Sequence, residues 1–186
     1  GGSYDGYVSK LSADGSSLLG STYFGGTSSV DTGLRLVFGG DGSLTLQGTT
    51  YAHDFPATAR ACDTSWDGAP CDVFVARFDA DLTEVLWATL LGGVANDYAG
   101  GLDLDPLGNP IVAGHTASGD FPTTPGSYDL SPNGSFDNFV AKLDGGAETQ
   151  KIAWIGRLDP GSLKIKVASA IVAMLIPRSA ALSRSI

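Results

Sequence analysis

Hydrophobic and polar residues alternate along three short segments of this chain. In 72–78 (DVFVARF), every second residue from Phe74 onward is apolar, so these side chains fall on one side of an extended backbone. Segments 5–11 (DGYVSKL) and 137–143 (DNFVAKL) repeat the same order of a large, a small and a large residue. The pattern predicts β-strands whose faces pack closely against neighbouring sheets.

The three segments belong to a longer internal repeat. Their first residues are 67 and 65 positions apart, and the intervening sequence also matches from one unit to the next. The matched pairs are STYFGG (21–26) with ATLLGG (88–93), and GDGSLTLQGTT (40–50) with DPLGNPIVAGHT (105–116). We assign a first repeat to 4–71, a second to 72–136, the start of a third to 137–145, and an atypical tail to 146–186.

Each unit contains four strand-like runs separated by turn signals. In the second unit the runs are 73–78, 84–91, 101–104 and 111–116. Dipeptides that tolerate a positive φ, such as Asp41-Gly42 and Gly108-Asn109, separate successive runs, as tight hairpins require. We therefore expect a local antiparallel meander.

Four-stranded antiparallel units repeated along a chain are typical of β-propeller blades. A closed propeller has roughly 4 to 8 blades, which is more than this chain encodes. The predicted fold is therefore all-β, with tandem four-stranded antiparallel blades of an incomplete β-propeller and an irregular C-terminal tail. Further blades would come from a longer chain of which this is a fragment, or from association of copies, and we favour the longer chain.

One loop occurs twice, as DFPATARACD at 54–63 and as DFPTTPGSYD at 120–129. A proline biases the residue before it toward extended backbone, so Pro56 and Pro122 would hold the preceding rings in one direction. We expect these rings, Phe55 and Phe121, to wedge into the joints between blades, and we assign Pro56 and Pro122 to the same inter-blade packing. The same inter-blade packing is expected of the aromatic residues that recur in the alternating strands, Tyr7, Phe74 and Phe139. The alternative is a solvent-exposed loop copied by duplication.

Composition agrees with an all-β chain and excludes one class of partner. The 26 glycines, with only 17% charged residues, are typical of short strands joined by tight turns. Residues 1–150 carry 5 Lys and Arg against 19 Asp and Glu, whereas residues 151–186 carry 6 against 1. Because the acidic main part repels phosphate, we expect no nucleic-acid partner.

The basic tail contains an uncharged stretch, 167–177, of 11 residues. A helix that crosses a bilayer needs about 20 apolar residues, so we expect no membrane span. We interpret the tail as a loosely ordered segment, with a membrane-surface helix as the alternative.

Cys62 and Cys71 are the only cysteines, and they flank one short loop. In an oxidising compartment they would close a disulfide, whereas in a cytosol they would stay reduced. We predict the disulfide. A zinc site does not fit, because the spacing is wrong and no histidine lies near enough in sequence.

Oxygen-bearing side chains alternate in two equivalent loops, each ending in glycine: Asp63, Ser65 and Asp67, then Asp129, Ser131 and Asn133. Such alternation resembles the first half of a calcium loop. The closing Glu is missing, since Phe74 and Val140 occupy its position. The same residues form ordinary Asx turns, so we favour turns over calcium and predict no cofactor.

Lys10, Arg77 and Lys142 recur at one repeat position. In a closed ring they could form a cationic circle that meets an anionic ligand. We favour pairing with carboxylates, for which Asp72 and Asp79 are local candidates.

Enzyme motifs are missing from the sequence. It has no G-x-S-x-G elbow, no H-E-x-x-H and no glycine-rich phosphate loop, and His53 and His115 occupy non-equivalent positions in the repeat. We assign no catalytic residue and expect a protein without enzymatic activity.

The segments DNFVAKLD and LLGGVANDYAGGLDLDPLGNPIVAGHTASGDFPTTPGSYD, with their first-unit counterparts, resemble the bacterial β-propeller repeat family known as SBBP repeats, over roughly residues 4–145. The resemblance implies tandem blades in a large secreted or surface-attached bacterial protein without an assigned reaction. The expected function is a structural or binding module, extracellular or at the cell surface, whose loops contact carbohydrate or protein. The alternative is a fragment of a propeller-type hydrolase or lyase whose catalytic residues lie partly outside this segment.

Overall fold

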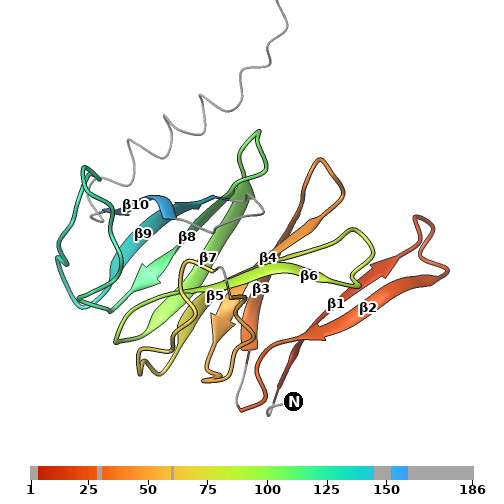
Figure 1. The fold of residues 1–186 in the computed structure, drawn as a ribbon, viewed down its shortest axis with the longest axis horizontal. Coiled ribbons are helices and arrows are strands. Elements are labelled where there is room, and N and C mark those ends of the chain that lie inside the picture. Colours follow the sequence, from red (N-terminus) through yellow and green to blue (C-terminus); the bar gives the residue numbers. More distant parts are fainter. Residues whose placement is uncertain (1–3, 29–30, 60, 145–151, 159–186) are drawn as a thin grey trace, which may run out of the picture.

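The computed structural model describes residues 4–28, 31–59, 61–144 and 152–158, and every regular element within them is a β-strand (Figure 1). The strands are β1 (Gly6–Leu11), β2 (Leu18–Phe24), β3 (Asp31–Phe38), β4 (Leu44–Thr50), β5 (Asp72–Phe78), β6 (Val85–Leu91), β7 (Asp97–Leu104), β8 (Pro110–Thr116), β9 (Asp137–Leu143) and β10 (Ile152–Leu158). This described part contains no helix long and apolar enough to cross a membrane.

The strands form three antiparallel sheets in which consecutive strands are neighbours. β1 pairs with β2, while β3 to β6 form one four-stranded sheet and β7 to β10 form another. Figure 1 shows the three sheets side by side in chain order, with the β3–β6 sheet between the other two. The predicted all-β fold, with four-stranded antiparallel blades of an unclosed propeller, is confirmed.

Each four-stranded sheet combines strands from two sequence repeats. β3 and β4 come from the repeat assigned to 4–71, whereas β5 and β6 of the same sheet come from the repeat assigned to 72–136. The chain passes from one sheet to the next just after the Gly-Gly pairs at 25–26 and 92–93, inside a sequence unit. The four-stranded sheets therefore begin at different points from the repeats assigned by sequence.

Two apolar clusters fill the joints between successive sheets. The first lies between β1–β2 and the β3–β6 sheet and contains Phe24, Phe55 and Phe74. The second lies between the two four-stranded sheets and contains Phe121 and Phe139. β5 contributes alternate side chains to both clusters, so nearly its whole length is buried. Burial on both faces explains its mostly apolar sequence.

β10 lies in the segment that the sequence analysis assigned to the tail. Its backbone pairs antiparallel with β9 and completes the third sheet. The sequence analysis placed no strand there, because the segment does not match the repeat. Pairing with β10 nevertheless gives hydrogen-bond partners to the backbone N–H and C=O groups that β9 would otherwise expose at its edge. The rest of the predicted tail, 146–151 and 159–186, lies outside the described residues.

Candidate functional site at the long-loop end

The two ends of the sheets differ in their connections. At one end, short hairpins join β1 to β2, β3 to β4, β5 to β6 and β7 to β8. At the other end, residues 51–71 and 117–136 form long loops from β4 to β5 and from β8 to β9. Because long loops on a rigid scaffold often carry function, this long-loop end is the candidate site.

Phe55 and Phe121 anchor the two long loops in the joints between sheets. Phe55 stacks on Phe74 with ring centroids 4.9 Å apart, and Phe121 lies 4.5 Å from Phe139. None of these four rings is more than 8% exposed. The two loops are therefore held in the same way, although their sequences diverge after the Asp-Phe-Pro motif.

Three other residues assigned to inter-blade packing lie elsewhere. Pro56 is exposed and Pro122 is half-buried, and neither belongs to the apolar clusters. Tyr7 is 67% exposed. It does not pack between blades in this structure, because among the described residues no sheet covers its face of β1.

The aspartate before each phenylalanine ties its long loop to the Gly-Gly loop between sheets. Asp54 accepts hydrogen bonds from the N–H groups of Thr27 (2.9 Å) and Ser28 (3.2 Å), and Asp120 accepts one from the N–H of Val94 (3.1 Å). Side-chain hydrogen bonds from Thr27 and then from Ser28 lower the pKa of Asp54 to about 2. The sequence analysis missed this role, although the aspartate recurs beside both phenylalanines.

Asp72 and Asp97 form a buried pair of carboxyl groups where β5 and β7 begin. They are 2% and 0% exposed, and a Cβ added at Gly92 would lie less than 3 Å from an oxygen of each. Asp97 accepts hydrogen bonds from the Gly93 N–H (2.9 Å) and the Ser118 hydroxyl (2.8 Å). The Oδ1 of Asp72 has no hydrogen-bond partner among the described residues.

Burial and repulsion change the protonation of this pair. Loss of contact with water, and then the negative charge of Asp97, raise the pKa of Asp72 to about 7. Asp31 begins β3 as Asp97 begins β7, and it accepts a hydrogen bond from the Gly26 N–H at 3.1 Å. Burial also raises the pKa of Asp31. The sequence analysis singled out neither group as a site residue.

Three rings from separate elements meet at the surface of the long-loop end. Tyr98 of β7 stacks on His115 of β8, with centroids 4.9 Å and planes 27° apart, and Phe136, just before β9, lies 5.7 Å from His115. His115 is exposed, and Phe136 is 51% exposed. These three residues, called the ring cluster below, offer apolar ring surface with polar groups on two of its members.

The predicted disulfide between Cys62 and Cys71 is absent, and both thiols are free. Asp63, next to Cys62, is held against β6 by a hydrogen bond from its N–H to the Thr89 side chain (3.1 Å), whereas Cys71 directly precedes β5 and has its Sγ 3.5 Å from Asn96 Oδ1. The loop therefore holds the two sulfurs in different surroundings. Burial raises the pKa of Cys62 to about 11, so this thiol stays protonated near neutral pH.

The two alternating triplets form Asx turns. Asp63 Oδ1 accepts a hydrogen bond from the Ser65 N–H at 2.8 Å, and Asp129 Oδ1 accepts one from the Ser131 N–H at 3.0 Å. The Asn133 side-chain amide donates to Asp129 at 2.6 Å. Across residues 4–28, 31–59, 61–144 and 152–158, no three His, Cys, Asp or Glu side chains are grouped so that they could hold a metal ion.

The three recurring cations form ion pairs at the short-hairpin end. The pairs are Lys10 with Asp81 (3.6 Å), Arg77 with Asp41 (2.9 Å) and Lys142 with Asp105 (2.6 Å). Their partners lie in the hairpins and are not Asp72 or Asp79, the candidates suggested by sequence. These cations therefore act within the scaffold, at the end opposite the candidate site.

No model of a known protein family matches the chain. Its similarity to the SBBP repeats therefore stays a prediction from the motifs quoted above.

Proposed function

We propose that this chain is a non-enzymatic binding module, a set of β-propeller blades that presents its long-loop end to a carbohydrate outside the cell. The observation that carries the proposal is the ring cluster of Tyr98, His115 and Phe136, in which exposed ring surface lies beside polar groups. A sugar ring presents the complementary surface, apolar C–H faces edged by hydroxyl groups. Sites of this kind combine aromatic walls with a few polar groups that fix orientation.

The scaffold beneath the ring cluster supports binding without rearrangement. Tyr98 and His115 lie opposite each other on the paired strands β7 and β8. The loop 117–136, which carries Phe136 at its end, is anchored by Phe121, which is 3% exposed and packed in the second joint. A surface held by paired strands and a buried anchor loses little conformational entropy on binding.

The rival function, a propeller hydrolase or lyase, finds less support in the described residues. Asp72 has the raised pKa expected of a general acid, but at 2% exposure it is out of a substrate's reach. His53, in the loop after β4, lies against the Trp66 ring at a tilt of 36°, whereas His115, in β8, is stacked on Tyr98, so the two histidines do not share a catalytic site. Extracellular location rests on the resemblance to secreted repeat proteins and belongs to the same proposal.

A glycan array, followed by calorimetric titration with the best glycan, tests the proposal. Phe136→Ala should raise the Kd roughly 3- to 10-fold, because it removes one stacking ring from the surface. Leu107→Ala is the matched control, since Leu107 is 85% exposed in the hairpin at the opposite end and should not affect binding.

Two results would overturn the carbohydrate proposal. One is an array on which no glycan binds the folded protein. The other is an equal effect of Phe136→Ala and Leu107→Ala on the Kd, which would place the bound glycan away from the ring cluster. Binding of a protein ligand that Phe136→Ala weakens would favour the protein-contact alternative.

A further inference from the structure

We propose that His53 and Trp66 on the first long loop, called the ring pair below, form a second carbohydrate subsite, and that one neutral polysaccharide chain contacts both the ring pair and the ring cluster. This inference rests on the carbohydrate-binding function proposed above. It adds a site on another blade and a class of ligand, a polymer without negative charge.

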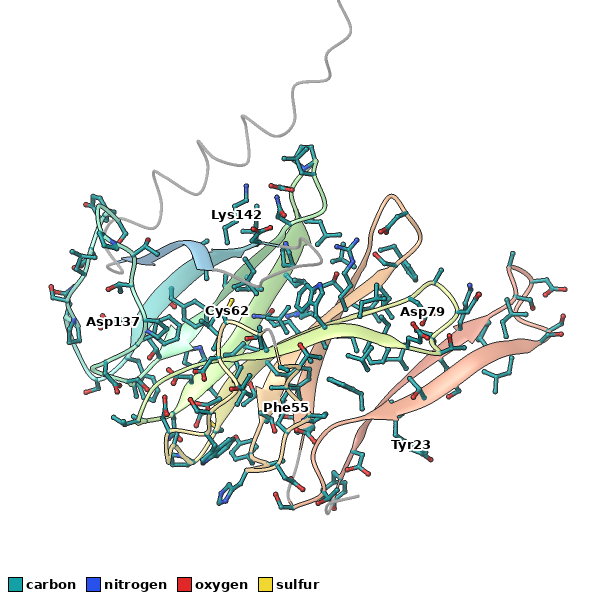
Figure 2. The ribbon with its side chains drawn as sticks, in the orientation of Figure 1. Tyr23, Phe55, Cys62, Asp79, Asp137 and Lys142 are labelled. Atoms are coloured by element: carbon teal, nitrogen blue, oxygen red, sulfur yellow. The ribbon has the colours of Figure 1, made fainter. Side chains whose placement is uncertain are left out.

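The ring pair is an aromatic surface at the same end of the molecule as the ring cluster. The ring centroids of His53 and Trp66 lie 4.9 Å apart, with the planes tilted by 36°. His53 is exposed, whereas Trp66 is half-buried and packs against the first apolar cluster. Figure 2 shows Phe55, in the first long loop, and Asp137, directly after the second, on the lower side of the molecule, away from Lys142 of the short-hairpin end. Like the ring cluster, the ring pair combines apolar ring surface with polar ring nitrogens, which suits a sugar ring.

The blade architecture does not account for the ring pair. When the Asp-Phe-Pro motifs of the two long loops are aligned, Gly119 takes the position of His53. When the alternating triplets are aligned, Pro132 takes the position of Trp66. The second loop is anchored by its phenylalanine in the same way without either ring, so the two rings are not needed to anchor a long loop. Side chains that vary between loops on a common scaffold are typical ligand contacts.

Hydrogen bonds to β6 fix the loop that carries the ring pair. The Thr58 N–H donates to the Ala88 carbonyl at 2.8 Å, and the Leu90 N–H donates to the Asp63 carbonyl at 3.1 Å. The Asx turn that starts at Asp63 directly precedes Trp66. Because the indole is already positioned, little conformational entropy would be lost when a sugar binds.

Tyr51 connects the ring pair to the ring cluster. It lies two residues before His53, and its side chain shares hydrogen bonds with those of Cys71 and of Tyr98, a member of the ring cluster. Two residues of extended chain span at most about 7 Å. The ring pair and the ring cluster are therefore neighbours across the joint between the two four-stranded sheets, and one sugar chain of several units could contact both.

The charges around both sites disfavour an anionic chain. The two long loops, 51–71 and 117–136, contain five aspartates and one arginine. Side-chain hydrogen bonds hold the pKa of Asp54, beside His53, at about 2. Hydrogen bonds from the Ser131 N–H and then from the Asn133 side chain also lower the pKa of Asp129 in the second loop. Both carboxylates are ionised at neutral pH and would repel a uronate or a sulfate group.

Native affinity electrophoresis in gels that contain a soluble polysaccharide tests the inference. The neutral probes are hydroxyethyl cellulose, xyloglucan, galactomannan and soluble starch, and polygalacturonate is the anionic probe. At least one neutral probe should retard the protein, whereas polygalacturonate should not. His53→Ala should reduce the retardation. Phe38→Ala is the matched control, because its ring is 66% exposed at the short-hairpin end and should not contact the chain.

Calorimetric titration with a hexasaccharide from the backbone of the retarding polymer separates one continuous surface from two independent sites. His53→Ala and Phe136→Ala should each raise the Kd roughly 3- to 10-fold, and the two factors should multiply in the double variant. Trp66→Leu keeps an apolar side chain against the first cluster and should raise the Kd at least as much as His53→Ala. An unchanged urea midpoint of His53→Ala would show that this exposed substitution leaves the fold intact.

Each outcome decides the inference. Equal retardation of His53→Ala and Phe38→Ala would overturn the second subsite, while weaker binding by Phe136→Ala would leave the function proposed above standing. An effect of His53→Ala on retardation but not on hexasaccharide binding would overturn the single continuous chain. Retardation by polygalacturonate alone would overturn the neutral ligand. If the glycan array shows binding but no polymer retards the protein, this inference alone fails, whereas an array without binding overturns both proposals.

Discussion

At the scale of single residues, the carboxyl group of Asp72 makes the stability of the molecule depend on pH. Its pKa is about 7 in the folded protein, against an ordinary value of 3.8, so the folded state binds the extra proton between these two pH values. The free energy of unfolding should therefore fall as the pH rises from about 4 to about 7. Asp72→Asn keeps the shape and removes the charge, and should stabilise the protein at pH 8 by about 1–3 kcal/mol.

Urea unfolding at pH 5 and pH 8 measures this effect. The gain from Asp72→Asn should be much smaller at pH 5, where wild-type Asp72 is already largely protonated. Asp103→Asn serves as the control, because Asp103 is exposed near the opposite end of β7 and should change stability little at either pH. A gain of the same size at both pH values would mean that Asp72 does not carry the proton assigned to it.

At the scale of strands, sequence alternation predicted elements well where both faces are buried and poorly where glycines intervene. The expected runs 73–78 and 111–116 differ from β5 and β8 by one residue each. The run expected at 101–104 missed the first half of β7, because Tyr98-Ala-Gly-Gly reads as a turn, whereas pairing with β8 and a bulge between Ala99 and Gly101 keep it extended.

The candidate site was less accessible to sequence reasoning than the strands. Phe55 and Phe121 were identified because a repeated motif marks them. The carboxyl pair was not, since Asp72 and Asp97 meet only through the packing of two sheets, and each alone looks like a residue that begins a strand. The ring cluster likewise depends on the register between β7 and β8, which no local pattern specifies.

Two glycines of one blade provide a test of strand packing. A Cβ at Gly114 would clash with the backbone carbonyl oxygen of Tyr98 and lie 2.7 Å from carbons of the Phe139 ring, whereas a Cβ at Gly101 would have its nearest neighbour, the Ala113 Cβ, at 3.8 Å. Gly114→Ala should therefore destabilise the protein by about 1–3 kcal/mol. Gly101→Ala should stay within about 0.5 kcal/mol of wild type. Urea unfolding of both variants makes the comparison, and equal losses would show that the packing of Tyr98 and Phe139 against β8 does not require glycine at position 114.

At the scale of the whole molecule, the offset between sequence repeats and blades predicts that one unit can be removed. Deletion of 72–136 would join the loop after β4 to β9, so that β3, β4, β9 and β10 could form a hybrid sheet with Gly48 opposite Phe139. We expect this variant to unfold cooperatively in urea with the circular dichroism of a β-protein. Deletion of 72–104, which leaves β8 to follow β4, should instead abolish cooperative unfolding.

The same offset bears on how such a chain can lengthen. A gene duplication whose ends fall at the unit boundary, between Cys71 and Asp72, inserts its new strands into the middle of an existing sheet. Each inserted unit then contributes two strands to the sheet before it and two strands to the sheet after it. Unequal crossing-over between units of this length would therefore give blades that share strands as soon as the duplication occurs. Backbone hydrogen bonds would then join the new unit to its neighbours before any side chain at the new joint has changed.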